Sequence, residues 1–403
     1  MFTILSLLDD RARPKGSRDP LGAEACWSQL GRRLVGNLTT VTSNLDNFIV
    51  ALLCCRFAHQ EQTGTAEAQA RYLRAEQVAA YLKLAANSTA GFLGVTRAKK
   101  NFTGNRPIVL GSSSEAQLLA SQAGYGLWGL YSSALEAVGL IAGEHRKLTS
   151  LGVELAGTIA AQLGAAGWDE FSRLASATAL DRTRTAGLAP RFALTLANPA
   201  LRSTIVGALL ASQRDCALQA ELFPLAQAYL AKHSAEWSAR KFCAWTIAND
   251  GASDALKTVM RRIDSLDPLL KLAEVVWLWL QLKDEKSAEE LAHELKPYLT
   301  GLQLDDAWQA EANLPHRAFL VKLHASILRA DADAAIRALV SQNTKLMRSR
   351  GGAPWIEIDG QQKLTVRVRN DRPQNLGALR NATGWHFNYF LYSFLSITNQ
   401  GRA

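Results

Sequence analysis

The stretch TAEAQARYLRAEQVAAYLKLAA, residues 65–86, shows a strong helical pattern. Its apolar side chains recur at intervals of three and four residues with polar side chains between them, which is typical of an amphipathic helix covering a core. Alanine and leucine, both strong helix formers, dominate the rest of the chain as well. The sequence therefore predicts a mainly helical fold.

Later segments repeat an order of helix, short polar turn and helix. LLKLAEVVWLWLQL (269–282) is followed by KSAEELAHELKPYL (286–299), and AFLVKLHASILRA (318–330) by AAIRALVSQNTKL (334–346). This order predicts antiparallel helical hairpins of the kind that solenoid proteins stack, although no repeating consensus accompanies it. The expected fold class is mainly α, a multi-helix and possibly solenoid-like array with a small C-terminal β-hairpin.

The β-hairpin is predicted from GGAPWIEIDGQQKLTVRVR, residues 351–369. Apolar and polar residues alternate on both sides of an Asp359-Gly360 turn, which is a hairpin signal. Side chains alternate between the two faces of a strand, so Lys363, Arg367 and Arg369 are expected on one face. They would either contact phosphates or protect an edge strand from aggregation.

The chain has 403 residues, more than a single hydrophobic core usually organises. Changes in composition divide it into three predicted regions. Residues 1–146 form an N-terminal helical domain with a basic arm and a basic loop, and residues 147–344 form a helical-hairpin domain. Residues 345–403 hold the basic β-hairpin and an aromatic C-terminal segment.

The formal net charge is +9, and a surface of this sign attracts polyanions. The cations gather in an N-terminal arm, in a loop rich in Gly and Ser, and in the hairpin region. Phosphate contacts made by such cations give affinity without sequence choice. The candidate nucleic-acid-binding residues are Arg11, Arg13, Lys15 and Arg18 in the arm, Arg97, Lys99, Lys100 and Arg106 in the loop, and Lys363, Arg367, Arg369 and Arg372 in the hairpin region.

Catalytic patterns do not emerge from the sequence. It has no phosphate-binding loop, dinucleotide-binding turn, nucleophile elbow or HExxH motif, so we expect no catalytic residues, no cofactor and no metal site. The five cysteines are odd in number and none has CxxC spacing, which is typical of reduced cytoplasmic thiols. Acid pairs such as Asp305 with Asp306 and Asp331 with Asp333 leave a metal-dependent nuclease as an alternative.

Residues 123–143, AGYGLWGLYSSALEAVGLIAG, are long enough to cross a bilayer. Glu136 and the glycines weaken insertion, so we predict a buried core helix here and no membrane partner. A membrane-acting effector that uses residues 123–166 remains a further alternative.

The leading hypothesis is a cytoplasmic, non-catalytic subunit of a bacterial multi-protein complex. It would bind nucleic acid through the phosphate backbone and present helical surfaces to other protein subunits. Antiviral defence and DNA processing use accessory proteins of this general character. The link to these systems is an analogy, because no sequence motif supports it. The sequence does not indicate whether a small molecule binds.

Overall fold

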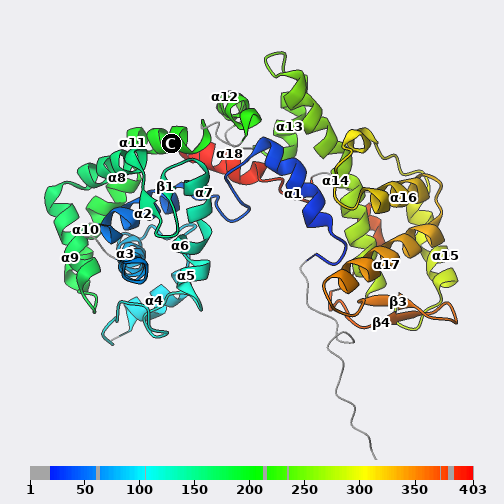
Figure 1. The fold of residues 1–403 in the computed structure, drawn as a ribbon, viewed down its shortest axis with the longest axis horizontal. Helices are drawn as coiled ribbons and strands as arrows, with labels where there is room; N and C mark the ends of the chain where they lie inside the picture. Colours follow the sequence, from blue (N-terminus) through cyan, green and yellow to red (C-terminus); the bar gives the residue numbers. More distant parts are fainter. Residues whose placement is uncertain are drawn as a thin grey trace, which may run out of the picture. The chain divides into compact units, whose positions relative to one another are not determined.

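The computed structural model describes residues 19–59, 64–104, 106–211, 216–233, 236–372, 374–379 and 385–402. Most of these residues are helical, and a two-stranded antiparallel hairpin lies near the end of the sequence, which confirms the predicted fold class (Figure 1). Residues 2–8, FTILSLL, are an apolar run that predicts a strand or a docked arm, and they lie outside the described residues.

The chain forms two compact units, and neither is a continuous stretch of sequence. Unit 1 comprises Met1–Arg33 and Ser238–Tyr389, and unit 2 comprises Leu34–Trp237 and Phe390–Ala403. The chain thus enters unit 2, leaves it for unit 1 and returns at Phe390. The bounds of these units differ from those of the three regions drawn from composition.

Unit 2 holds most of the shorter helices. They are α2 (Leu45–Ala58), α3 (Thr65–Ala85), α4 (Val95–Thr103), α5 (Gln122–Tyr125), α6 (Leu127–Leu130), α7 (Ser132–Ala137), α8 (Ser150–Leu163), α9 (Ala165–Ser176), α10 (Arg182–Leu196), α11 (Pro199–Leu210), α12 (Ala217–Lys232) and α18 (Leu391–Gln400). The strands β1 (Ile141–Ala142) and β2 (Lys147–Leu148) pair antiparallel between α7 and α8.

Unit 1 contains the longest helix and the hairpin. Its elements are α1 (Ala23–Leu34, whose last residue belongs to unit 2), α13 (Ala239–Ala248), α14 (Asp254–Leu280), α15 (Ala288–Leu299), η2 (Ala307–Ala310), α16 (Arg317–Leu328), α17 (Ala332–Ser349), β3 (Ile356–Ile358), β4 (Leu364–Val366) and η3 (Leu376–Leu379).

Helix α3 lies at the centre of unit 2, packed against α2, α4, α9 and α10. Between Arg71 and Lys83 almost every side chain is buried, so the exposed polar face expected of an amphipathic helix is absent. The polar side chains are buried because each has a partner: Arg71 donates to the carbonyl of Phe57, and Gln77 donates to the side chain of Gln122. The polar residues of the α3 pattern therefore make hydrogen bonds inside the unit and do not form a solvent-exposed face.

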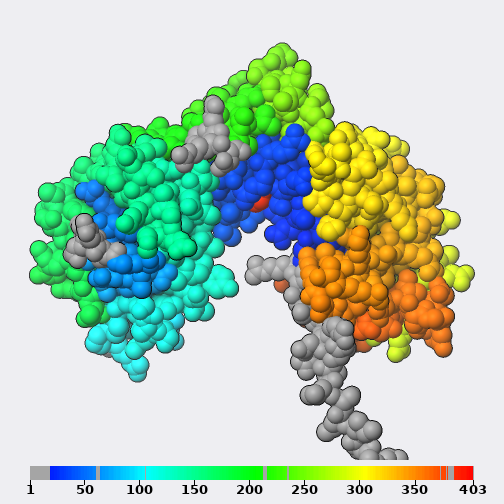
Figure 2. Space-filling model, viewed as in Figure 1, coloured from blue at the N-terminus to red at the C-terminus, as the bar shows by residue number. Residues whose placement is uncertain are grey.

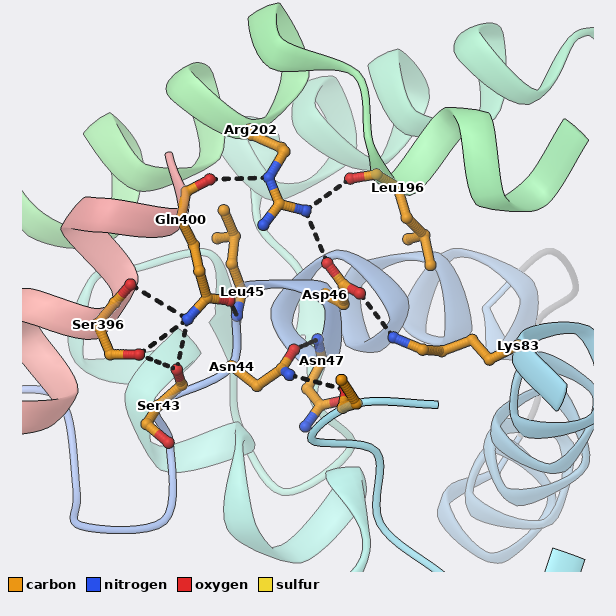
Figure 3. A network of polar contacts seen from close by, with 11 residues as sticks. Ser43, Asn44, Leu45, Asp46, Asn47, Lys83, Leu196, Arg202, Ser396 and Gln400 are labelled. Carbon is orange, nitrogen blue, oxygen red and sulfur yellow. Dashed lines mark hydrogen bonds and ion pairs between the residues drawn. The ribbon is translucent and has the colours of Figure 1, made fainter. Parts of the chain in front are cut away.

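The buried ammonium of Lys83 is neutralised by Asp46, in the first turn of α2 (Figure 3). The Lys83 side chain is 1% exposed, and its Nζ lies 2.6 Å from a carboxylate oxygen of Asp46. Arg202 of α11 binds the other oxygen at 2.7 Å. Burial opposes ionisation of Asp46, but Lys83 and Arg202 together hold its pKa below the usual range.

The same cluster attaches α18 to unit 2 after the chain has passed through unit 1. Arg202 donates to the carbonyls of Leu196 and Gln400. The Gln400 side chain accepts the N–H of Leu45 and donates to the carbonyl of Ser43 (Figure 3). Helix α18 packs on α11 and α12, so residues near the end of the sequence complete the unit that begins at Leu34.

Residues 123–143 do not form the single core helix that we predicted. They form α5, α6 and α7 in three short turns, followed by β1. A side chain on Gly129 would overlap the carbonyl oxygen of Gly124, and one on Gly126 would overlap the carboxylate of Glu76. The glycines are therefore required by tight backbone turns, which break the helix.

The described helices were also compared with the length and hydropathy needed to cross a bilayer. Among the described residues no single helix is long and apolar enough. The pair α10 and α11, bent by 59°, meets the criteria of length and composition when both are taken together.

The two predicted helical hairpins of unit 1 have different outcomes. Helices α16 and α17 pack together, as predicted. Helix α15 packs against α17 and not back along α14, so the first hairpin is wrong. The expected polar turn instead runs beside β4, because Glu285 donates to the carbonyl of Leu364 and Leu364 donates to that of Lys286. Strand β4 is thereby bonded on both sides and is not a free edge.

Glu76 is a buried carboxyl group on α3, 2% exposed. One oxygen accepts the N–H of Leu127 at 2.8 Å. Burial raises the pKa of Glu76 to about 7, an effect that hydrogen bonds from Leu127 and from the side chain of Gln122 only partly offset. The folded state therefore binds this proton more tightly than the unfolded chain.

We predict that Asp46→Asn lowers the unfolding free energy by about 3 kcal/mol, because it leaves the Lys83 ammonium buried without a counterion. Urea unfolding followed by circular dichroism measures this loss. The control is Glu170→Gln, which breaks the more exposed ion pairs with Arg173 and Arg184 and should cost at most about 1 kcal/mol. Equal losses for the two variants would contradict a special role for Asp46.

The raised pKa of Glu76 predicts that stability falls as pH rises from about 4.5 to about 7, because the folded state holds a proton that the unfolded state has released. Glu76→Gln should remove this dependence and raise the unfolding free energy at pH 8 by about 1 kcal/mol or more. Urea unfolding at pH 5 and pH 8 tests this. The control, Glu154→Gln on the exposed side of α8, should behave as wild type at both pH values.

Candidate nucleic-acid interface

The predicted basic residues fall into three groups. Arg11, Arg13, Lys15 and Arg18 lie outside the described residues. Arg97, Lys99, Lys100 and Arg106 belong to unit 2, whereas Lys363, Arg367, Arg369 and Arg372 belong to unit 1. Each of the two described groups is therefore considered by itself.

Helix α4 presents two lysines to solvent. Its inner side is fixed because Ala98 is buried and Phe102 stacks on Tyr81 of α3, with ring centroids 6.0 Å apart. Lys99 and Lys100 are both exposed, and the segment that contains α4 lies at the surface of unit 2 (Figure 2, cyan). The segment predicted as a loop is thus partly helical, which fixes the backbone from which the two lysines project.

Arg97 and Arg182 hold this region in place. Arg97 donates to the carbonyl of Ser114 at 2.7 Å. Arg182, at the start of α10, donates to the carbonyls of Gly104 at 2.6 Å and Arg106 at 2.9 Å. Arg97 was predicted to contact phosphate, but its guanidinium is engaged with the backbone.

The sequence reading did not find Arg182. An arginine that fixes a distant loop has no local pattern that distinguishes it from a solvated arginine, because its acceptors are main-chain carbonyls about 80 residues away. Three cations of the region remain exposed and form no ion pair with any described residue. We call them the α4 basic surface, and they are Lys99, Lys100 and Arg106.

The hairpin has the predicted alternation, since Leu364 and Val366 are buried and Lys363, Arg367 and Arg369 are exposed. Two of these cations are paired with carboxylates. Arg367 lies 2.6 Å from Glu357 on the partner strand, and Arg369 lies 2.6 Å from Asp284.

Acidic residues also border the hairpin. A depression of about 490 Å³ beside Arg369 is lined by Asp284, Glu285 and Asp371, among others. Arg372 is exposed and lies next to Asp371 in the sequence. The charges around the hairpin are therefore mixed, and the α4 basic surface is the better candidate for phosphate contacts.

The acid pairs that suggested a metal-dependent nuclease have local structural roles. Asp331 caps α17 by accepting the N–H of Ala334, and Asp333 pairs with Arg337 one turn along. Asp305 accepts the N–H of Ala307, two residues along the chain. Within the described ranges, no group of three or more His, Cys, Asp or Glu side chains could hold a metal ion.

Comparison with protein-family models, with curated proteins and with solved structures found no match for this chain. Among its described residues, the chain offers an exposed group of cations without ion pairs on unit 2 and a hairpin on unit 1 whose arginines are paired.

We predict that Arg367→Glu with Arg369→Glu lowers the unfolding free energy by up to about 1 kcal/mol, because two ion pairs become repulsive contacts. Thermal unfolding measures the effect. The control is Lys345→Glu with Arg372→Glu, which changes the net charge equally at exposed residues that form no ion pair in the described structure. If both double variants unfold at the same temperature, the two ion pairs contribute nothing.

Proposed function

We propose that this chain is a cytoplasmic, non-catalytic subunit of a multi-protein complex, and that it binds the nucleic-acid backbone through the α4 basic surface. The observation that carries the proposal is the exposure of Lys99, Lys100 and Arg106 on a segment fixed by Arg182. A segment whose backbone is already fixed loses little backbone freedom on binding, which favours its use for phosphate contacts.

The contacts offered are of the kind that positions a protein on nucleic acid without reading sequence. Lysine is a flexible point charge suited to phosphate oxygens. Phe102, the aromatic residue of α4, stacks on Tyr81 and is not presented as a platform for bases. We therefore infer binding that depends strongly on salt and weakly on base sequence, as accessory subunits in DNA processing or antiviral defence would need.

Partner subunits would be expected to cover apolar side chains that the folded chain leaves in solvent. Leu194 on α10 is 73% exposed and Tyr125 on α5 is 64% exposed. Single exposed apolar residues are common on protein surfaces, so these two are positions to test by crosslinking and not an interface in themselves.

Lys99→Glu with Lys100→Glu should weaken binding to a short labelled DNA duplex by about tenfold or more at low salt, because two phosphate contacts are lost. The plot of log K against log salt should become shallower by about 2. Fluorescence anisotropy in EDTA measures both quantities, since backbone contacts need no metal.

The matched control is Lys147→Glu with Lys232→Glu, which makes the same charge change at exposed residues of unit 2 outside α4. A local interface predicts that this control loses much less affinity than the α4 variant. Equal losses would show that only the net charge matters, and absence of binding by the wild-type chain to both DNA and RNA would refute the proposal.

A further inference from the structure

Unit 1 contains a cavity of about 360 Å³ that lies apart from all the predicted binding residues. Its walls include four aromatic side chains: Trp27 on α1, Trp277 on α14, Trp355 before β3, and Phe387. Their positions in the sequence are far apart, and folding brings them together around one space. The volume lies in the range of small-molecule sites.

The aromatic walls are held by hydrogen bonds from the backbone. The buried carboxylate of Asp267 accepts the N–H of His386 at 2.8 Å and that of Phe387 at 3.0 Å. Asp267 is 2% exposed, and it fixes the position of Phe387 from α14. Trp27 lies next to Phe387, with ring centroids 6.1 Å apart and planes 18° from parallel. The cavity is therefore formed before any ligand binds.

The charged groups that line the cavity are all acidic. They are Asp19, Glu24 and Glu274, with no lysine or arginine among the lining residues. One carboxylate oxygen of Glu274 also lies 2.6 Å from Nε2 of His386, so that ring partly compensates its negative charge. The polar Gln281 is already engaged, because its amide donates to the carbonyl of Val368 at 2.8 Å.

Aromatic faces carry a negative quadrupole and attract cations, and sites for quaternary ammonium groups use such rings. Carboxylates at the same cavity add charge of the right sign and disfavour a phosphate-bearing ligand. We propose that this cavity binds a small organic cation that carries a quaternary or alkylated ammonium group. The rings of Trp27, Trp355 and Phe387 would contact the cation, and Glu24 and Glu274 would supply opposite charge.

Choline and its neutral carbon isostere 3,3-dimethyl-1-butanol form a matched pair of probes, because they share shape and hydroxyl group and differ in charge. Titration calorimetry should show saturable binding of choline that is at least about tenfold tighter than that of the isostere. Equal affinities, or no saturable binding of choline, would overturn the proposal.

Two sets of variants test the assigned contacts. Glu24→Gln with Glu274→Gln should weaken choline binding about tenfold or more, whereas Glu285→Gln with Glu289→Gln, on exposed residues of unit 1 outside the cavity, should leave it unchanged. Phe387→Leu removes an aromatic face and keeps an apolar side chain, so it should weaken choline several-fold and leave the neutral isostere almost unaffected. Circular dichroism checks that each variant is folded, and losses shared by the control pair would contradict the assignment.

Discussion

The buried ammonium of Lys83 is the constraint on which unit 2 depends. A charge this deeply buried is tolerated only with a counterion and hydrogen bonding. Asp46 supplies both, and its other carboxylate oxygen is bound by Arg202. Satisfying Lys83 fixes the start of α2 against α3, and Arg202 extends the cluster to α11 and to the end of α18. After the chain has passed through unit 1, this cluster fixes the position of α18 against α2 and α11.

The positive charge of the chain is divided by the fold into three uses. Some cations lie inside the structure or support it, as Lys83, Arg97 and Arg182 do. Others are paired at the surface, as Arg367 and Arg369 are in the hairpin. Only the remainder, which includes Lys99 and Lys100, is offered to a partner. The net charge of +9 therefore overstates the surface available to a polyanion.

The two proposed sites call for different ligands. The α4 basic surface is open and cationic, and suits a long polyanion that makes many weak contacts. The cavity of unit 1 is lined by aromatic and acidic residues, and suits a small cation. If both proposals hold, the chain would combine nucleic-acid contacts on one unit with a small-molecule site on the other, so each can be tested without the other.

The sequence by itself determined the helical class and the β-hairpin, because the spacing of apolar residues reports which face of a local element is buried. It also identified Lys99 and Lys100 as candidates, since a cluster of cations without acids is a local pattern. It could not determine that residues 123–143 break into three turns, because the close approach of Gly126 to Glu76 joins two segments distant in sequence. Nor could it predict that Arg369 pairs with Asp284, or that Arg182 binds the carbonyls of Gly104 and Arg106. The tertiary structure alone decided which charges are paired, buried or free and which aromatic residues surround a cavity, because those outcomes depend on side chains far apart in the chain.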